Sequence, residues 1–213
     1  MSKQPYKTPL FVKGLMLTLI AAAAWALYLA DWINVFMSLA TLGLMAFSIH
    51  FSTKMDFYFP RSLITASVIF IYATLFLGEI ANFYEKYWWW DSLLHVSSAI
   101  GFGLVGFTLL ILLFHSKRIT ASPFMLCLFG FSFALALGAL WEIWEFTLDQ
   151  LFGLNTQKSG LPDTMWDLII DAIGGAIAAI AGYFYLVKSK PNNALTAVID
   201  TMVEENVETT EKK

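Results

Sequence analysis

Six long apolar stretches constrain the fold of this chain more than any other feature of its sequence. A transmembrane helix needs roughly 20 mainly apolar residues, and each stretch reaches or approaches that length. The third is short unless it continues through Gly78 and Glu79. We therefore predict an all-α, polytopic membrane helix bundle of about six transmembrane helices. The predicted spans are Phe11–Ala30, Ile33–Ile49, Leu63–Leu77, Leu93–Phe114, Phe124–Phe146 and Met165–Val187.

The composition argues against a soluble protein. Hydrophobic residues make up 58% of the chain and charged residues 14%, against about 45–50% and about 25% in a typical soluble domain. Intrinsic disorder is excluded for most of the chain, because disorder requires low hydrophobicity and high charge. The single cysteine, Cys127, provides neither a disulfide framework nor a thiolate metal cluster. The spans carry no nucleic-acid-binding signature, so we expect membrane lipid rather than nucleic acid around this chain.

Two regions follow from the distribution of apolar residues: a six-helix transmembrane domain over 1–187 and a polar tail over 188–213. Apolar residues of the tail recur at helical spacing, which predicts a short amphipathic helix. Its polar face is acidic, which argues against binding to anionic lipid. A disordered or partner-binding tail is the simpler expectation. The apolar tail residues are Leu195, Val198, Ile199, Met202 and Val203.

Lys and Arg are distributed unevenly between the loops. If the N-terminus is inside, 11 of the 13 lie in inner segments, and only Lys86 and Lys158 lie outside. Cytoplasmic segments of membrane proteins carry such an excess of Lys and Arg, so we predict that both termini are cytoplasmic. Ten acidic residues fall at the outer side. Six tryptophans lie near the same ends and predict an interfacial aromatic belt, or alternatively an aromatic wall around a site: Trp88, Trp89, Trp90, Trp141, Trp144 and Trp166.

Charged side chains inside three spans form the candidate functional site. Such residues are costly in a membrane and are usually functional. Residues three or four positions apart share one helix face, so the charged residues of each span lie together on one face of that helix. If the three helices pack together, these groups meet one or two turns below the outer surface. The groups are Asp91 with His95, then Glu142 with Glu145 and Asp149, then Asp163 with Asp167 and Asp171.

So many carboxylates cannot all be ionised side by side without a counter-charge. Either a divalent cation lies among them, or several are protonated and exchange protons. Carboxylates with one imidazole suit Mn, Fe, Zn, Mg or Ca, and the choice stays open. We interpret Asp163 as an N-cap and Asp149 as a solvated side chain. The predicted metal ligands are Asp91, His95, Glu142, Asp167 and Asp171.

Two segments carry a family resemblance. Asp91-Ser-Leu-Leu-His95, and Trp141-Glu142 through Asp167-Leu-Ile-Ile-Asp171-Ala-Ile-Gly174-Gly175, resemble the YjdF-type family of uncharacterised bacterial inner-membrane proteins. They are more distantly similar to the VanZ-like group, where Asn is usual at the position of Asp171 and the outer loop carries an Arg. The resemblance implies a multi-pass protein of the bacterial inner membrane with an envelope-related function.

Three functions are compatible with these residues. The first is a metal-dependent enzyme acting on a lipid or cell-envelope substrate, in which the cation polarises an oxygen or activates water. Glu142 or Glu145 is then the general base. The second is a divalent-cation or proton-coupled transporter, although few polar groups lie in the inner halves of the spans. The third is a non-catalytic membrane protein with a structural ion site. The sequence leaves the oligomeric state open.

Overall fold

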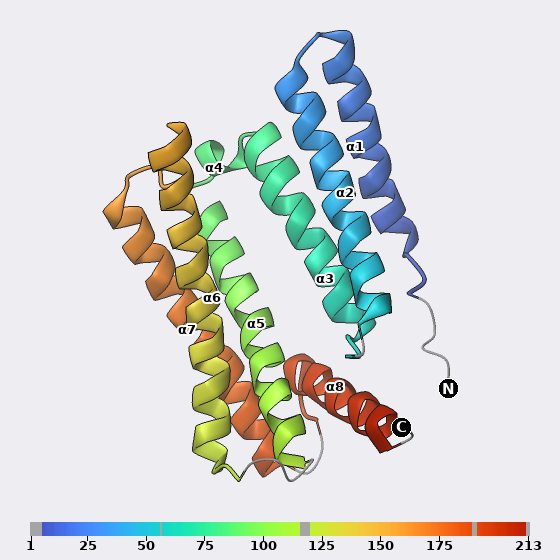
Figure 1. Cartoon of the computed structure of the whole chain (residues 1–213), viewed down its shortest axis with the longest axis vertical. Coiled ribbons are helices and arrows are strands. Elements are labelled where there is room, and N and C mark those ends of the chain that lie inside the picture. The colour runs from blue at the N-terminus through green and yellow to red at the C-terminus, as the bar shows by residue number, and fades with distance from the viewer. Residues whose placement is uncertain (1–5, 56, 116–119, 189–190, 212–213) are drawn as a thin grey trace. The chain divides into compact units, whose positions relative to one another are not determined.

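A computed structural model describes residues 6–55, 57–115, 120–188 and 191–211, and every regular element in these ranges is a helix (Figure 1). Six helices within the described residues are long and apolar enough to cross a membrane, which confirms the predicted number of spans. Their exposed surfaces are rich in large apolar side chains, as lipid contact requires. The six are Leu10–Tyr28, Trp32–Lys54, Arg61–Ile80, Trp90–Phe114, Pro123–Phe152 and Leu161–Val187.

The chain divides into two compact units, Met1–Trp90 and Asp91–Lys213. The first unit begins with a tight helical hairpin of α1 (Leu10–Tyr28) and α2 (Trp32–Lys54). Asp31 lies in the turn, as predicted, and caps α2: its Oδ1 accepts a hydrogen bond from the Asn34 backbone N–H. An acceptor at this position satisfies one of the backbone donors that a helix start leaves unpaired.

The third span combines two kinds of helix. α3 (Arg61–Ile71) continues directly into the π-helical segment η1 (Tyr72–Ile80), so the span does run through Gly78 and Glu79. The short helix α4 (Phe83–Lys86) follows. Trp90, expected in an interfacial belt, is instead buried and lies edge-on to Phe83 with ring centroids 4.9 Å apart. The belt interpretation therefore fails for this tryptophan.

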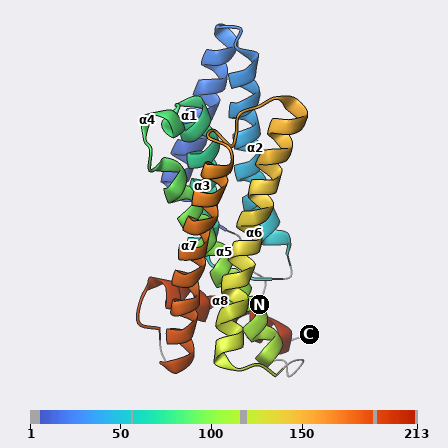
Figure 2. The same ribbon diagram turned by 90° about the vertical axis from the view of Figure 1, so that its left-hand side faces the viewer.

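The second unit packs three long helices tightly: α5 (Trp90–His115), α6 (Pro123–Phe152) and α7 (Leu161–Val187). Figures 1 and 2 show α6 and α7 side by side. Phe107 of α5 is fully buried. A Cβ atom added at Gly130 of α6 would lie 3.0 Å from the Cβ of Phe107, and one at Gly182 of α7 would lie 2.7 Å from its ring. Glycine thus permits the close approach of all three helices.

Turn-forming residues shape the hairpin between α6 and α7. Gly153 ends α6 with a positive φ of 65°, and Gly160 precedes α7 with a φ of 70°. Glycine adopts these angles without a Cβ clash. α7 begins at Leu161, so Asp163 lies inside its first turn and is not the N-cap. The N-cap interpretation of Asp163 is therefore wrong.

The tail folds into a helix over its described residues. α8 (Ala194–Glu211) packs against α7. Ile199 and Met202 are fully excluded from solvent, which confirms the amphipathic pattern. The simpler expectation of disorder is therefore wrong for this segment. Its start is capped by Asn193, whose Oδ1 accepts a hydrogen bond from the Thr196 backbone N–H at 2.9 Å.

Candidate functional site

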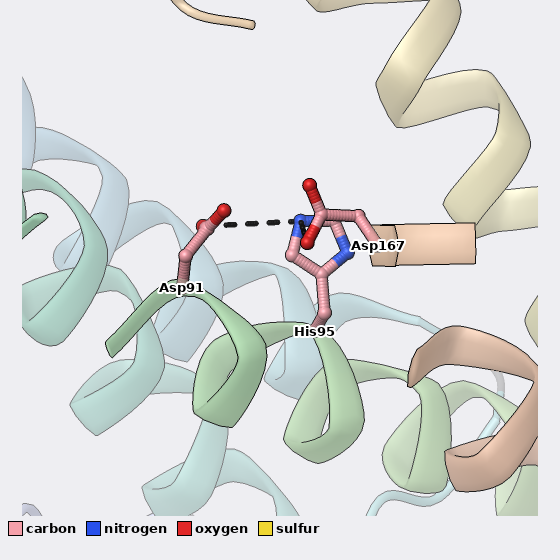
Figure 3. A group of neighbouring side chains, drawn as sticks. All are labelled: Asp91, His95 and Asp167. Atoms are coloured by element: carbon pink, nitrogen blue, oxygen red, sulfur yellow. Dashed lines mark ion pairs between the residues drawn. The ribbon is translucent and has the colours of Figure 1, made fainter. Parts of the chain in front are cut away.

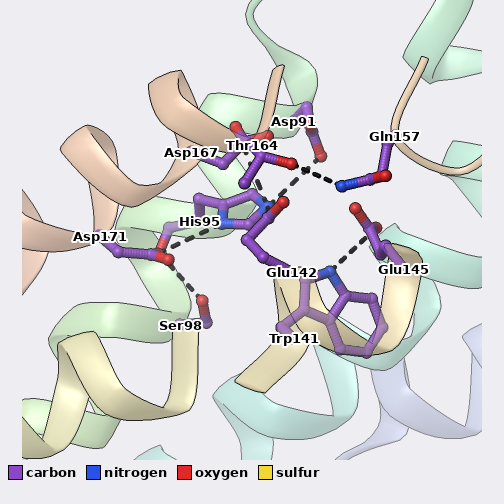
Figure 4. Close-up of polar contacts among 10 residues, drawn as sticks. All are labelled: Asp91, His95, Ser98, Trp141, Glu142, Glu145, Gln157, Thr164, Asp167 and Asp171. Carbon is purple, nitrogen blue, oxygen red and sulfur yellow. Dashed lines mark hydrogen bonds and ion pairs between the residues drawn. The ribbon is translucent and has the colours of Figure 1, made fainter. Parts of the chain in front are cut away.

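Three helices of the second unit bring the predicted site residues to one end of their packing. Asp91 lies in the first turn of α5, and His95 follows one turn later. Glu142 lies near the C-terminal end of α6, whereas Asp167 and Asp171 lie near the start of α7. Because α6 is antiparallel to α5 and α7, the C-terminal end of α6 lies beside the N-terminal ends of the other two helices. Figure 4 shows the four carboxylate side chains turned toward the His95 ring.

One nitrogen of His95 faces three carboxylates, each contributed by a different helix. Its Nε2 lies 3.9 Å from Asp91 Oδ1, 3.8 Å from Glu142 Oε1 and 4.0 Å from Asp167 Oδ1. Figure 3 shows two of these carboxylates beside the ring. One ligand atom each of Asp91, His95 and Asp167 lies within 4.8 Å of the others. These atoms therefore surround one small space.

The other ring nitrogen has a different partner. His95 Nδ1 lies 3.2 Å from Asp171 Oδ1, close enough for a hydrogen bond. A carboxylate only accepts hydrogen bonds, so an ionised Asp171 makes Nδ1 the donor. In a neutral ring this leaves the lone pair on Nε2, pointing toward Asp91, Glu142 and Asp167. Asp171 is thus separated from the other acids by the width of the imidazole.

Burial makes this arrangement expensive. Asp171 is 1% exposed and Glu142 is 4% exposed, whereas the Asp91 side chain at the edge is 34% exposed. Both carboxylate oxygens of Glu142, and Oδ2 of Asp171, make no hydrogen bond of good geometry among the described residues, although the Thr164 side chain lies close enough to Glu142 to act on its carboxylate. An unpaired buried polar group costs about 1–3 kcal/mol, and an unpaired charge costs more. The buried Glu142 carboxylate therefore requires either a proton or a positive charge beside it, such as a protonated His95 or a cation.

The spacing of the cluster fits a small cation. Zinc and similar ions bind nitrogen and oxygen at about 2.0–2.2 Å, so two atoms on one ion lie no more than about 4.4 Å apart. All three distances from Nε2 are 4.0 Å or less, but the group whose ligand atoms all lie within 4.8 Å of one another is Asp91, His95 and Asp167, and Glu142 is not part of it. The residues therefore can hold a metal after a small inward movement of the carboxylates.

Glu145 lies beside the cluster rather than on the imidazole. Its Oε1 accepts a hydrogen bond from Trp141 Nε1 at 3.0 Å, so the indole fixes one side of this carboxylate. Figure 4 shows Glu145 on the same side of α6 as Glu142. The arrangement places a second, half-buried carboxylate next to the candidate ion ligands. It also gives Trp141 a contact at the site in addition to its exposed surface.

A hydrogen-bonded loop, which the sequence did not indicate, borders the site. Asp149 is not merely solvated: it accepts hydrogen bonds from the Thr156 and Gln157 backbone N–H groups at 2.7 and 3.0 Å. Gln157 Nε2 in turn donates to Thr164 Oγ1 at 2.7 Å. Thr164 lies three residues before Asp167, and helical spacing could have identified it. Gln157 lies in the loop, where helical spacing cannot be used to predict which residues lie near the site.

The loop also brings a positive charge to the site that the helix faces alone do not contain. Lys158, with a left-handed φ of 40°, interacts electrostatically with Asp91 and Asp163. Its position at the exposed edge leaves the buried Glu142 and Asp171 carboxylates to be balanced by another group.

Fold and site together define an integral membrane protein with a buried histidine–carboxylate cluster. The model of a family described as predicted membrane protein (DUF2238) matches residues 11–188, and the chain belongs to this family. An uncharacterised protein of Thermotoga maritima is 39% identical over 113 residues, which are 53% of this chain and 56% of that protein. The match thus spans little more than half the length of this curated relative. No solved structure matches the chain.

Proposed function

We propose that the cluster binds a divalent cation between His95 Nε2 and the carboxylates of Asp91, Glu142 and Asp167. One observation carries this proposal: the buried Glu142 carboxylate makes no hydrogen bond of good geometry among the described residues, and its Oε1 lies 3.8 Å from His95 Nε2. A lone pair and three carboxylates directed at one space repel each other unless a positive charge lies between them. A divalent cation removes this repulsion and supplies Glu142 with a partner.

In this proposal Asp171 orients the histidine instead of binding the ion. Metal-bound histidines almost always donate their second ring N–H to a carboxylate or carbonyl, which fixes the ring and its tautomer. The contact of 3.2 Å between Nδ1 and Asp171 Oδ1 has this geometry. The role differs from the ligand role that the sequence suggested for Asp171. One imidazole among the donors favours Mn²⁺, Fe²⁺ or Zn²⁺ over Mg²⁺ or Ca²⁺.

The packing beneath the cluster favours a fixed reaction centre over a transport pathway. A Cβ atom at Gly174 would lie 2.7 Å from Ala99 Cβ and 2.7 Å from the Val96 carbonyl oxygen. Deeper still, Phe107 fills the space beside Gly130 and Gly182. An ion leaving the cluster in this direction would meet closely packed apolar groups. The arrangement therefore supports an enzyme more than a transporter.

As an enzyme centre, the cation acts as a Lewis acid or lowers the pKa of a bound water. Glu145 is the proposed general base because it lies beside Glu142 while its carboxylate remains half-buried and hydrogen-bonded to Trp141. The Lys and Arg distribution supports cytoplasmic termini in a bacterial inner membrane, which would place the site near the outer leaflet. Fusion of a periplasm-active reporter to the C-terminus tests this orientation, since activity there would contradict it.

Facing the outer leaflet, the site would act on a lipid or cell-envelope substrate. The resemblance to YjdF-type and VanZ-like proteins supports an envelope-related role. Hydrolysis of labelled envelope lipids by purified protein, with and without added Mn²⁺ or Zn²⁺, tests the substrate class. Equal turnover by wild type and Glu145→Gln would argue against Glu145 as the base.

Metal analysis of the purified protein tests the proposed ion site. We expect about one Mn²⁺ or Zn²⁺ per chain by elemental analysis, and a raised unfolding temperature. A ligand at 100 times its Kd stabilises the folded state by about 2.7 kcal/mol. His95→Ala should lose both effects. His50→Ala is the matched control, because His50 is an exposed histidine on α2.

Two outcomes would contradict the proposal. One is retention of stoichiometric metal by His95→Ala. The other is a wild-type protein that neither retains a metal nor gains thermal stability from Mn²⁺, Zn²⁺, Mg²⁺ or Ca²⁺. In that case His95 itself, as an imidazolium ion, is the positive partner of the acids, because all four carboxylates lie within 4.0 Å of its nitrogens. The cluster would then be a proton-binding site.

A further inference from the structure

A series of hydrogen bonds in the α6–α7 loop connects Asp149, at the end of α6, to Thr164 of α7, beside the cluster. Asp149 Oδ1 accepts hydrogen bonds from both the backbone N–H and the hydroxyl of Thr156, each at 2.7 Å, and its Oδ2 accepts one from Gln157 N–H. The Thr156 hydroxyl also lies 3.1 Å from the Glu145 carbonyl oxygen. The loop is therefore tied to the end of α6, which also carries Glu142.

The next contact passes from the loop to α7. Gln157 Nε2 donates to Thr164 Oγ1 at 2.7 Å. Because the hydroxyl oxygen accepts this bond, its own hydrogen remains to be donated elsewhere. Thr164, Asp167 and Asp171 recur at i, i+3 and i+7, so they share one face of α7. Figure 4 shows Thr164 and Gln157 beside Glu142 and Asp167.

We infer that Thr164 is a positioning residue for Glu142, and that Asp149 and Gln157 hold Thr164 in place. This inference rests on the proposed cation site. Glu142 Oε1 faces the imidazole, and the Thr164 side chain interacts with this carboxylate, although without a hydrogen bond of good geometry. When Oε1 binds the ion, Oε2 becomes the acceptor for the Thr164 hydroxyl. The carboxylate then binds through one oxygen, in a fixed orientation.

The chain of contacts has a kinetic consequence. A carboxylate held by a second hydrogen bond stays directed at its ion, so it releases the ion more slowly than a carboxylate that rotates freely. Loss of such supporting partners typically costs about 10- to 100-fold in metal affinity. The loop thereby controls ion exchange without itself touching the ion.

Dissociation of Mn²⁺ from the purified full-length protein tests this inference. The Mn²⁺-loaded protein is mixed with excess chelator in a stopped-flow instrument, and affinity is measured from the electron paramagnetic resonance signal of free Mn²⁺. We expect Thr164→Val and Gln157→Ala to release Mn²⁺ about tenfold faster or more. Thr164→Ser, which keeps the hydroxyl, should restore the wild-type rate. Gln150→Ala, an exposed neighbour of Asp149, is the matched control.

A double-mutant cycle tests the role of Asp149. If Asp149 acts through Gln157, the Asp149→Ala/Gln157→Ala protein should release Mn²⁺ no faster than the faster single variant. Additive effects would overturn the proposed chain of contacts. Wild-type release from Thr164→Val, or equally fast release from Thr164→Ser and Thr164→Val, would overturn the role of the hydroxyl.

Folding and the cation site are tested separately from this role. Circular dichroism of each metal-free variant shows whether it folds, and the inference can be tested on Thr164→Val and Thr164→Ser alone if Asp149→Ala unfolds. A wild-type protein that binds no Mn²⁺, while Zn²⁺ binding persists, would move the same measurement to Zn²⁺ and a zinc-sensitive dye. Binding of neither ion would reject the cation site, and this inference with it.

Discussion

The first unit pairs hydroxyl groups between helices, whereas the second unit buries charged groups around one histidine. In the first unit, Ser48 of α2 meets Ser67 of α3 at 3.0 Å, and Thr18 of α1 meets Tyr72 at 2.9 Å. Each hydroxyl in these pairs gains a partner on another helix. Ser38 Oγ and Thr74 Oγ1 of the first unit are buried without a hydrogen-bond partner among the described residues, as is Glu142 of the second unit, but only Glu142 can carry a charge.

This difference separates a polar contact that stabilises a fold from one that serves a function. Hydrogen bonds between membrane helices contribute about 0.6 kcal/mol on average, and neutral hydroxyls can pair with each other. Carboxylates have no hydrogen to share when ionised, so a group of them needs a proton or a cation. Polar groups of the first unit thus explain packing. The charged groups of the second unit support the proposed cation site.

Among the predicted changes, Asp171→Asn in the charged cluster of the second unit should have the largest effect on metal affinity. Asparagine keeps the size of the side chain but removes the charge that orients the histidine. We expect metal affinity to fall about 10- to 100-fold while the bound stoichiometry is unchanged at saturating metal. Titration with Mn²⁺ or Zn²⁺ measures both quantities. Complete loss of binding would instead identify Asp171 as a direct ligand.

Gly138→Ala tests how closely the charged cluster depends on backbone packing. A Cβ atom at Gly138 of α6 would overlap the Asp171 carboxylate. Overpacking of this kind typically costs about 1–3 kcal/mol, so we expect a lower unfolding temperature and weaker metal binding. Gly101→Ala is the control, because an added Cβ there has nothing within 4 Å. Similar losses in both variants would show that the Asp171 contact is unimportant.

Tyr72→Phe tests the paired hydroxyl groups of the first unit and should have the smallest effect on stability. It removes the hydrogen bond with Thr18, for which we expect a loss of about 0.6 kcal/mol in the free energy of unfolding. Metal affinity should stay at the wild-type value. Chemical unfolding in detergent micelles and metal titration measure the two quantities. A change in metal affinity would show that the two units do not divide structure and ligand binding in this way.

The sequence predicted the spans well, because lipid imposes a minimum apolar length on each helix. It placed helix ends less well. α2 continues past Ile49 to Lys54 through polar residues. There the Ser52 hydroxyl donates to the Ile49 carbonyl and the Thr53 hydroxyl to the His50 carbonyl. The helix therefore ends in a polar turn, which lies outside the apolar stretch from which the span was predicted.

The members of the charged cluster were also predictable, since spacing alone places Asp91 with His95 and Asp167 with Asp171. The sequence could not predict which carboxylates face Nε2 and which faces Nδ1, because this depends on how the imidazole is rotated among three helices. The contact between Gly138 and Asp171 was equally hidden. It arises from the relative position of α6 and α7, which no local pattern in either segment contains.

The glycine contacts beneath the cluster have a consequence for ion size. Asp171, and with it the histidine ring, lies against the Gly138 backbone and has little room to retreat. Asp91 lies at the exposed start of α5 and can move outward. If the proposed cation binds, Asp91 has more room to move for a larger ion than the histidine held by Asp171, so the site should adjust mainly on the Asp91 side. Selection between ions of equal charge would then depend on three closely packed helices rather than on the ligands themselves.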